Sequence, residues 1–345
     1  MRVLIEIPHP ARVHLFRNVY FSLIERGHEV LVVYKEKEQT EKLLEIYKIP
    51  AKKIGKNRKG FFKKMVELCR EFLNLFSLGV KFRPSVVLGG ASPVLGLASF
   101  FFRAKYISFS DTEHASLTWK LSRPFINLII TPHCFLNDLG KNQVRIQGYK
   151  ELAYLHPKYF KPDFTILKEL GIEENESYSL LRFISWDALH DVGHTGLDFE
   201  DKKETVKELL KYGKVFISSE AELPEELKKY QLKTAPEKIH DVLYYAALFF
   251  GESGTMATES AILGTPTVRV STLSKFLGNF KELNEDYDLL YFYENGKEGL
   301  KKCIEILDDK DSKEKWKQKA NKLMNDKIDV TDYLIQSIEK YNTHG

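Results

Sequence analysis

The chain has 345 residues, of which 43% are hydrophobic and 29% charged, and its formal net charge is +4. This composition excludes a disordered or fibrous protein, and the length favours two domains over a single core. The start of the chain has a charge inside its only apolar segment, and the three cysteines fit neither a disulfide framework nor a metal motif. The longest uncharged run, residues 85–102, is interrupted by glycines, a proline and serines, so no membrane span is expected. We therefore expect a cytoplasmic protein.

Positive charge is concentrated in the first part of the chain. Residues 1–148 contain 24 lysines and arginines against 12 aspartates and glutamates, whereas the remainder contains 28 against 36. Much of the excess lies in residues 52–64, a basic loop that enters an aromatic-rich helix. This segment is either a solvated loop and helix face or a docking site for anionic lipid, which would place the protein peripherally on the inner face of the membrane. No nucleic-acid motif accompanies it, so no nucleic-acid partner is expected.

Short apolar strands alternate with helical patterns along the whole chain. In the first half we expect helices at 14–26, 38–47 and 61–80, and strands at 2–7, 29–34, 85–88, 105–109 and 127–131. In the second half we expect helices at 201–211, 224–230, 237–246 and 255–263, and strands at 178–184, 214–218 and 268–270. This alternation is typical of α/β proteins with parallel sheets.

The alternation is interrupted once, by a segment with two prolines and several aromatic residues. We therefore predict an N-terminal Rossmann-like domain at 1–148, an interdomain connection at 149–163 and a second Rossmann-like domain at 164–329. The last segment, 330–345, is expected to form a helix that crosses back to the first domain.

The most informative motif is residues 252–270, which read as a small-residue turn, a helix closed by Gly264, and a buried strand. A strand, a glycine turn and a helix N-terminus bring free N–H groups and the positive end of a helix dipole to one point, which suits a phosphate. Glu259, one turn into the helix, is able to accept both hydroxyls of a ribose. The alternative is an ordinary α/β crossover, and for Arg269 at the strand end the alternatives are a phosphate contact and a salt bridge.

Three segments resemble the GT-B fold of nucleotide-sugar glycosyltransferases, in which two Rossmann-like domains face each other across a cleft. The helix motif resembles the donor site of the N-acetylglucosaminyltransferase that forms lipid II. The resemblance implies that Glu259 holds the ribose and that the turn binds the diphosphate through Ser253, Gly254, Thr255 and Met256. The segment containing Gly89, Gly90 and Ser92 resembles that family's acceptor loop, and the one around His14 its first-loop histidine.

The resemblance is incomplete in the first domain. The family's glycine-rich first loop is replaced by Pro8–Arg12, and its His-Glu-Gln-Asn segment by Asp111–His114. The same segments also resemble non-hydrolysing UDP-N-acetylglucosamine 2-epimerases, which share the fold. Over nearly its whole length the chain resembles an uncharacterised archaeal and bacterial GT-B-like family, with residues 148–151 and 185–191 as markers.

Candidate catalytic residues lie at the expected carboxyl ends of strands in the first domain, where open α/β folds bind ligands. His14 begins a helix after the first strand, and a neutral imidazole there is able to take a proton from a hydroxyl. His9 competes for that role, and Arg12 lies between them. Asp111 and Glu113 follow a later strand, where either carboxylate is a candidate base or, alternatively, a helix cap.

Further candidates come from the second domain. Arg182 and Ser185 are suited to contact phosphate, and Ile239 lies where related folds line the nucleobase. The loop that follows Arg182 carries Trp186, His190, Asp191 and His194. The last three have the residue types of a metal site, but GT-B enzymes characteristically need no bound metal, so neither a metal nor a cofactor is expected.

These features predict a glycosyltransferase that moves a sugar from a nucleotide sugar, with UDP favoured as the nucleotide, to an acceptor hydroxyl. The acceptor is suggested to be carried on a polyprenyl phosphate that meets the basic segment 52–64. The alternatives are a UDP-sugar 2-epimerase and a nucleotide-sugar-binding protein without catalysis.

Overall fold

A computed structural model gives the architecture of the chain. It describes residues 1–37, 39–56, 60–113, 115–184, 197–219, 222–272, 274 and 277–341, apart from the side chains of 61–64. The chain divides into two compact units. Unit 1 comprises Met1–Tyr159 with Ile328–Gly345, and unit 2 comprises Phe160–Lys327.

Unit 1 is built on a seven-stranded sheet in the order β3-β2-β1-β4-β5-β6-β7, in which every neighbouring pair is parallel. Its strands are β1 (Arg2–Ile7), β2 (Glu29–Glu36), β3 (Ala51–Lys56), β4 (Val86–Gly89), β5 (Lys105–Phe109), β6 (Leu128–Pro132) and β7 (Gln143–Ile146). The central strands are buried on both faces, as parallel sheets covered by helices require. The expected parallel sheet is thus confirmed.

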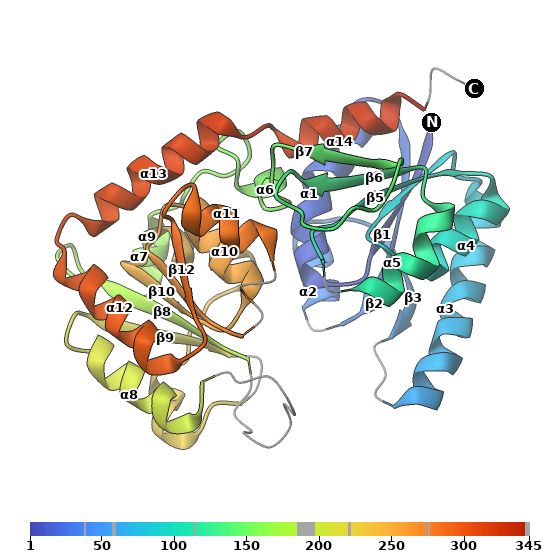
Figure 1. Cartoon of the computed structure of the whole chain (residues 1–345). Helices are drawn as coiled ribbons and strands as arrows, with labels where there is room; N and C mark the ends of the chain where they lie inside the picture. The colour runs from blue at the N-terminus through green and yellow to red at the C-terminus, as the bar shows by residue number, and fades with distance from the viewer. Residues whose placement is uncertain are drawn as a thin grey trace. The chain divides into compact units, whose positions relative to one another are not determined.

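Helices cover both faces of this sheet (Figure 1). One layer contains α1 (Pro10–Glu25), α2 (Thr40–Ile46), α6 (Leu152–Leu155) and α14 (Val330–Glu339). The other contains α3 (Phe61–Phe82), α4 (Pro93–Phe102), α5 (Ser116–Ser122) and the short 3₁₀ helix η1 (Arg123–Phe125). Both α1 and α4 begin with a proline preceded by a residue whose side chain caps the helix, which fixes where each starts.

The sequence did not predict the edge strand β3, since its lysines read as the start of a basic loop. In the structure Lys52, Lys53 and Lys56 are exposed along this edge strand. Lysine is common at such positions because it discourages pairing with a further strand.

The last helix belongs to unit 1. The N–H of Ile328 donates to the carbonyl of Gln147 (2.8 Å), and Asp329 caps α14 by accepting the N–H of Asp332. Asp329 also accepts the hydroxyl of Tyr159 at 2.7 Å. These bonds hold α14 against α1 and α6, so the chain returns to unit 1 after completing unit 2.

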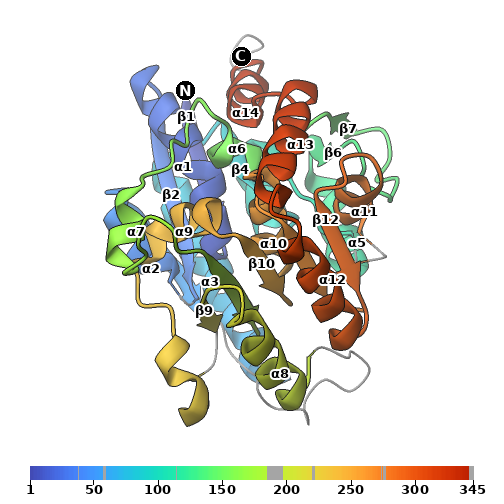
Figure 2. The ribbon, with the colours of Figure 1, turned by 90° about the vertical axis from the view of Figure 1, so that its left-hand side faces the viewer.

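Unit 2 has a five-stranded sheet in the order β12-β11-β10-β8-β9, again with every pair parallel. Its strands are β8 (Tyr178–Phe183), β9 (Lys214–Ser219), β10 (Leu248–Gly251), β11 (Thr267–Val270) and β12 (Leu290–Tyr293). Helices α8 (Phe199–Leu209) and α12 (Gly296–Asp308) lie side by side (Figure 2). The others are α7 (Thr165–Glu169), α9 (Ile239–Tyr245), α10 (Gly254–Ile262), α11 (Gly278–Glu285), α13 (Ser312–Asp326) and the 3₁₀ helices η2 (Glu225–Tyr230) and η3 (Pro236–Lys238).

Gly251 ends β10, directly beside Arg182 of β8. A Cβ at this position would lie 2.3 Å from the Arg182 carbonyl oxygen, which is backbone and unable to move aside cheaply. The close approach of these two strands therefore depends on glycine, and it sets the position at which the next segment leaves the sheet.

We expect Gly251→Ala to lower the free energy of unfolding by about 3 kcal/mol, because the extra methyl forces two paired strands apart. Urea denaturation measures this change. Gly55→Ala is the matched control, since its Cβ would meet its nearest neighbour at 3.4 Å, an ordinary contact. Equal effects of the two substitutions would contradict the steric argument.

Candidate functional site

Charged residues gather at the carboxyl edge of the sheet in unit 1. Glu6 lies near the end of β1, Gly90 directly follows β4, and Asp111 follows β5. Because these three strands are parallel neighbours, their ends meet at one edge. A Cβ on Gly90 would lie 3.0 Å from Nη2 of Arg12, so glycine allows that guanidinium to pack against the backbone.

Arg12 is the cation of this group. Its Nη1 donates to the carbonyl of Phe109 at 2.6 Å, which ties α1 to the end of β5. Burial lowers the pKa of Arg12, and the neighbouring carboxylates of Asp111 and Glu6 oppose that shift. The side chain remains a cation at neutral pH, since arginine is effectively always protonated.

Glu6 is a fully buried carboxyl group in the central strand of the sheet. Its Oε1 accepts the hydroxyl of Ser92 at 3.2 Å, whereas its Oε2 accepts no hydrogen bond from any residue that the structure describes. A Cβ on Gly89 would lie 3.2 Å from that Oε2. Burial raises the pKa of Glu6, and the charge of Lys35 works against this rise.

Asp111 forms an ion pair with Lys150, whose Nζ lies 2.6 Å from Oδ2. Burial alone raises the pKa of Asp111, but the charge of Lys150 and its hydrogen bond outweigh this effect and hold the pKa below its usual range. Lys150 also lies 3.4 Å from a carboxylate oxygen of the buried Glu151. Asp111 is therefore an ionised carboxylate that lies close to the charges of Lys150 and Arg12.

The other predicted catalytic residues of unit 1 have partners of their own. His9 caps α1 through Nδ1, and Glu113 accepts the N–H of Leu136 at 2.9 Å. His14 points into the helix layer, where Nδ1 lies 3.3 Å from the Tyr47 hydroxyl and the ring centroid 5.5 Å from that of Tyr154. Of the predicted residues of unit 1, the structure brings together Arg12, Gly89, Gly90, Ser92 and Asp111. His14 is instead buried in the helix layer.

In unit 2 the predicted phosphate turn forms the N-terminus of α10. Ser253 caps the helix, and its hydroxyl accepts the N–H of Met256 at 3.4 Å. The N–H groups of Gly254 and Thr255 have no intrahelical acceptor, because the first turn of a helix leaves them unused. Ser253, Gly254 and Thr255 are partly exposed, so this turn is open to a ligand.

Arg269 of β11 lies against this helix start. Its Nε donates to the carbonyl of Glu252 (3.2 Å) and its Nη1 to the hydroxyl of Ser274 (2.7 Å). The guanidinium also lies over the ring of Phe280, 4.4 Å from the centroid. No carboxylate of the described residues forms an ion pair with it, although Arg269 is only 6% exposed. Burial lowers the pKa of Arg269 to about 10.

This arrangement leaves a buried positive charge beside a helix N-terminus. A Cβ on Gly254 would lie 3.6 Å from Nη2 of Arg269, so the glycine at the first position of the helix lies next to the guanidinium. The sequence left two interpretations of Arg269, a phosphate contact and a salt bridge. No salt bridge of Arg269 is found among the described residues. Both the helix dipole and the guanidinium favour an anion at this place.

Glu259 is buried in α10, and its Oε1 lies 3.1 Å from Nε2 of His240 in α9. His240 in turn contacts the ring of Phe160 edge-on. Ile239, which the sequence predicted to line the nucleobase, is the first residue of α9 and is partly buried. The pair was not predicted from the sequence, since the two residues are 19 positions apart and the pairing depends on how α9 packs against α10.

Glu252 holds the two ends of the loop that joins β8 to α8. Its Oε2 accepts the N–H of Ile184 (3.0 Å), its Oε1 accepts that of Leu197 (3.1 Å), and Lys202 lies 3.6 Å from Oε2. Arg182, at the end of β8, donates to the hydroxyl of Ser218 at 2.8 Å. One carboxylate thus fixes both ends of this loop next to the start of α10.

The remaining predicted residues of that loop, Ser185, Trp186, His190, Asp191 and His194, lie outside the described residues. Within the described part of the chain, no group of three His, Cys, Asp or Glu residues is arranged to hold a metal ion. No helix in that part combines the length and the apolar composition needed to cross a membrane.

The ion pair of Asp111 leads us to predict how the stability of the folded protein depends on pH. A carboxylate whose pKa is lower in the folded state stabilises the protein above its unfolded value of about 3.9, and this contribution is lost as the pH falls through the folded pKa. We expect Asp111→Asn to lower the melting temperature at pH 7, and the difference from the wild type to shrink below about pH 4. Thermal unfolding at pH 7, 5, 4 and 3 measures this.

Asp138→Asn is the control, because Asp138 is exposed in the same unit and pairs with no described cation. Its difference from the wild type should stay small at every pH. A constant difference for Asp111→Asn over the whole range would count against a stabilising ion pair with Lys150.

Comparisons with known proteins agree with this fold. The chain is similar to the uncharacterized protein MJ0665 of Methanocaldococcus jannaschii, with 26% identity over 279 residues, which cover 77% of this chain and 80% of that protein. Among solved structures it is similar to the UDP-GlcNAc 2-epimerase from Neisseria meningitidis bound to UDP-GlcNAc, with a TM-score of 0.69, 12% identity and 100% of both chains covered. It is also similar to the Streptomyces sp. SF2575 glycosyltransferase SsfS6, with a TM-score of 0.58, 15% identity and 98% and 99% of the two chains covered.

At these identities the structural similarities show the fold, which is the GT-B-like fold shared by epimerases and glycosyltransferases. The expected fold class is therefore confirmed. A family description, "Protein of unknown function (DUF354)", matches residues 1–337. This match covers almost the whole chain, and the chain belongs to that family.

Proposed function

We propose that this protein is a glycosyltransferase that binds a UDP-sugar through unit 2 and transfers the sugar to an acceptor hydroxyl. The observation that carries the proposal is Arg269, a buried cation without a carboxylate partner among the described residues, beside the open N-terminus of α10. The burial of a charge that lacks an ion-pair partner is unfavourable, so a diphosphate at this point would stabilise both the guanidinium and the helix end.

The rest of the donor is assigned to the neighbouring residues. Glu259 is proposed to accept the ribose hydroxyls, and its bond to His240 would hold the carboxylate in one orientation. The proposal is supported by the fold, since one protein with this fold has been solved with UDP-GlcNAc bound and another is a glycosyltransferase. As the sugar transfers, the leaving nucleoside diphosphate gains charge, which the N–H groups of α10 and Arg269 would stabilise.

The acceptor side of the reaction is proposed to use unit 1. The acceptor hydroxyl attacks the anomeric carbon, its proton passes to a carboxylate, and the bond to the diphosphate breaks. Asp111 is the carboxylate that the geometry favours, because it is ionised and lies with Arg12 at the carboxyl edge of the sheet. His14 and Glu113 remain predicted alternatives, each already held by other groups of unit 1.

The substitution Arg269→Met tests whether Arg269 binds the nucleotide or only stabilises the fold. We expect UDP to bind the variant roughly 10- to 100-fold more weakly, because a charge-assisted bond to phosphate is lost. The melting temperature without ligand should stay the same or rise, because the variant no longer buries a cation that lacks an ion-pair partner. Isothermal titration calorimetry with UDP and thermal unfolding without ligand give the two values.

Lys313→Met is the matched control. Lys313 is also a basic residue of unit 2, but burial lowers its pKa well below the usual value, and its Nζ donates to two carbonyls and to the hydroxyl of Thr265, each at 2.7 Å. Its replacement should lower the melting temperature and leave UDP affinity unchanged. The same outcome for Arg269→Met, or no UDP binding by the wild type, would remove the proposed donor site.

A second candidate is a UDP-sugar 2-epimerase, which uses the same donor site without an acceptor. The group of acids and bases in unit 1 favours it, because C2 deprotonation and elimination of the nucleotide require paired acid and base groups. The epimerase structure bound to UDP-GlcNAc, which matches the full length of both chains, adds support.

Turnover in heavy water distinguishes the two reactions. A transferase should release UDP only when an acceptor is added, and the sugar recovered without an acceptor should contain no deuterium. Deuterium at C2 of recovered UDP-GlcNAc would favour the epimerase and contradict the transferase. Binding of UDP-sugars without either result would leave a nucleotide-sugar-binding protein.

A further inference from the structure

Unit 1 has an exposed apolar surface on the outer side of one helix layer. Ten of the 17 large hydrophobic side chains that are exposed among the described residues lie on α3, α4 and α5. We call this surface the α3–α5 face, and it consists of Met65, Val66, Leu68, Leu73, Val80, Leu97, Phe100, Phe101, Leu117 and Leu121. Contacts between α3 and α4 and between α4 and α5 make it continuous.

Aromatic rings connect α3, α4 and the 3₁₀ helix η1 beneath and across this face. Phe76 of α3 contacts Phe101 of α4, with ring centroids 5.8 Å apart. Phe101 contacts Phe100 at 5.9 Å, and Phe100 contacts Phe125 of η1 at 6.3 Å. Phe100 is nevertheless 67% exposed and Phe101 56%. The rings are thus held in place by one another while most of their surface meets solvent.

The exposed charges around the α3–α5 face have one sign. Residues 65–110 contain only two acidic side chains, Glu67 and Glu71, and both are buried. Glu71 pairs with Lys35 at 2.6 Å, and Glu67 accepts the N–H of Lys56 at 2.9 Å. Neither carboxylate therefore contributes to the outer surface.

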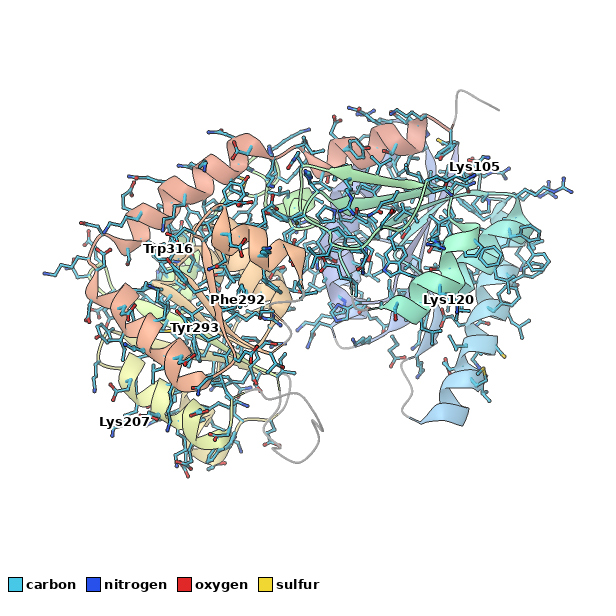
Figure 3. The ribbon with its side chains drawn as sticks, in the orientation of Figure 1. Lys105, Lys120, Lys207, Phe292, Tyr293 and Trp316 are labelled. Atoms are coloured by element: carbon cyan, nitrogen blue, oxygen red, sulfur yellow. The ribbon has the colours of Figure 1, made fainter. Side chains whose placement is uncertain are left out.

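The cations, in contrast, point outward. The exposed basic residues of this layer are Arg70, Lys81, Arg83, Arg103, Lys105, Lys120 and Arg123. Within the described part of the chain only Arg70 has an acidic partner, at 4.0 Å from Glu67. Lys105 and Lys120 lie on the α3–α5 side of unit 1 (Figure 3). The surface is apolar, and of the exposed cations around it all but Arg70 lack an acidic partner among the described residues.

This combination identifies its partner by chemistry. Leu and Phe side chains flanked by Lys and Arg are typical of surfaces that lie in the headgroup region of a membrane, where apolar groups enter the acyl boundary and cations meet anionic headgroups. A second copy of the chain is a poor partner, since a two-fold interface would bring the same cations face to face. We propose that the α3–α5 face docks on an anionic lipid surface.

The location differs from the segment that the sequence suggested. Of the lysines at 52–64 whose side chains are described, Lys53 and Lys56 both pair with Glu36, and Lys56 does so at 3.2 Å. This one carboxylate compensates part of their charge. The α3–α5 face supplies both the apolar groups and the free charge that membrane docking needs, and it does not depend on which reaction the protein catalyses.

Vesicle co-sedimentation tests the proposal with the full chain. We expect binding to phosphatidylcholine vesicles that contain 30% phosphatidylglycerol, little binding to pure phosphatidylcholine, and weaker binding at high salt. Because each cation near such a surface contributes about 1 kcal/mol, Lys81, Arg103 and Lys120 changed together to Ala should weaken binding on the order of 100-fold. Phe100→Glu and Leu73→Glu should each reduce it strongly as well.

Matched controls come from unit 2. Phe164 is 72% exposed, so Phe164→Glu changes a similar side chain away from the face. Lys207, Lys301 and Lys310 are exposed lysines without a described acidic partner, and Lys207 is labelled in Figure 3. Neither Phe164→Glu nor the triple replacement of these lysines by Ala should affect vesicle binding, and thermal unfolding should show all variants folded.

Three results would overturn the proposal. The first is no binding of the wild type to anionic vesicles. The second is equal binding of the α3–α5 variants and the wild type, which would place the contact elsewhere. The third is concentration-dependent dimerisation in light scattering that Phe100→Glu abolishes while vesicle binding is unchanged, which would make the face a protein interface.

Discussion

Parallel pairing of the strands is the constraint on which both units depend. Because every neighbouring pair in the two sheets is parallel, the turns that follow the strands of each unit meet at one edge of its sheet. In unit 1 this edge brings Glu6 and Arg12, from the start of the chain, together with Asp111, which is far from both in the sequence. In unit 2 it gathers Glu252, the start of α10 and Arg269. The chemistry of each unit is therefore confined to one edge, and the helix layers remain available for other contacts.

The buried cations at the two sheet edges differ in whether they form ion pairs with carboxylates. In unit 1 each cation has a carboxylate nearby, as Asp111 has Lys150 at 2.6 Å. In unit 2 Arg269 bonds to a carbonyl and a hydroxyl and lies over an aromatic ring, and the nearby carboxylate of Glu252 acts on it without forming an ion pair. Since a buried cation without an ion-pair partner destabilises the protein, its place at a helix N-terminus supports the anionic ligand that we propose there. The same comparison explains why the donor is assigned to unit 2.

The sequence predicted those features that depend on local pattern. The alternation of strands and helices gave the two parallel sheets, and the small residues at 253–255 gave the start of α10. It missed β3, because an edge strand rich in lysine has the composition of a loop. It also missed partners that only packing creates, such as His240 for Glu259 and Lys150 for Asp111. Glu6 left a readable signal, an acidic residue in an otherwise apolar strand, whose meaning depended on the neighbours that the fold supplies.

The excess of positive charge in residues 1–148 can now be compared at two surfaces of unit 1, the carboxyl edge of the sheet and the α3–α5 face. At the carboxyl edge of unit 1 the cations Arg12 and Lys150 face Glu6, Asp111 and Glu151, so little net charge is left there for an anionic substrate. On the α3–α5 face the carboxylates are buried and the cations are exposed, so part of the excess lies on the outer surface of these helices. A field of one sign on that surface acts on an extended anionic partner and contributes little to the binding of a small substrate at the sheet edge. The positive charge of this part of the chain is therefore better explained by docking than by the chemistry of the edge, and an acceptor carried in a lipid layer would bring the two together.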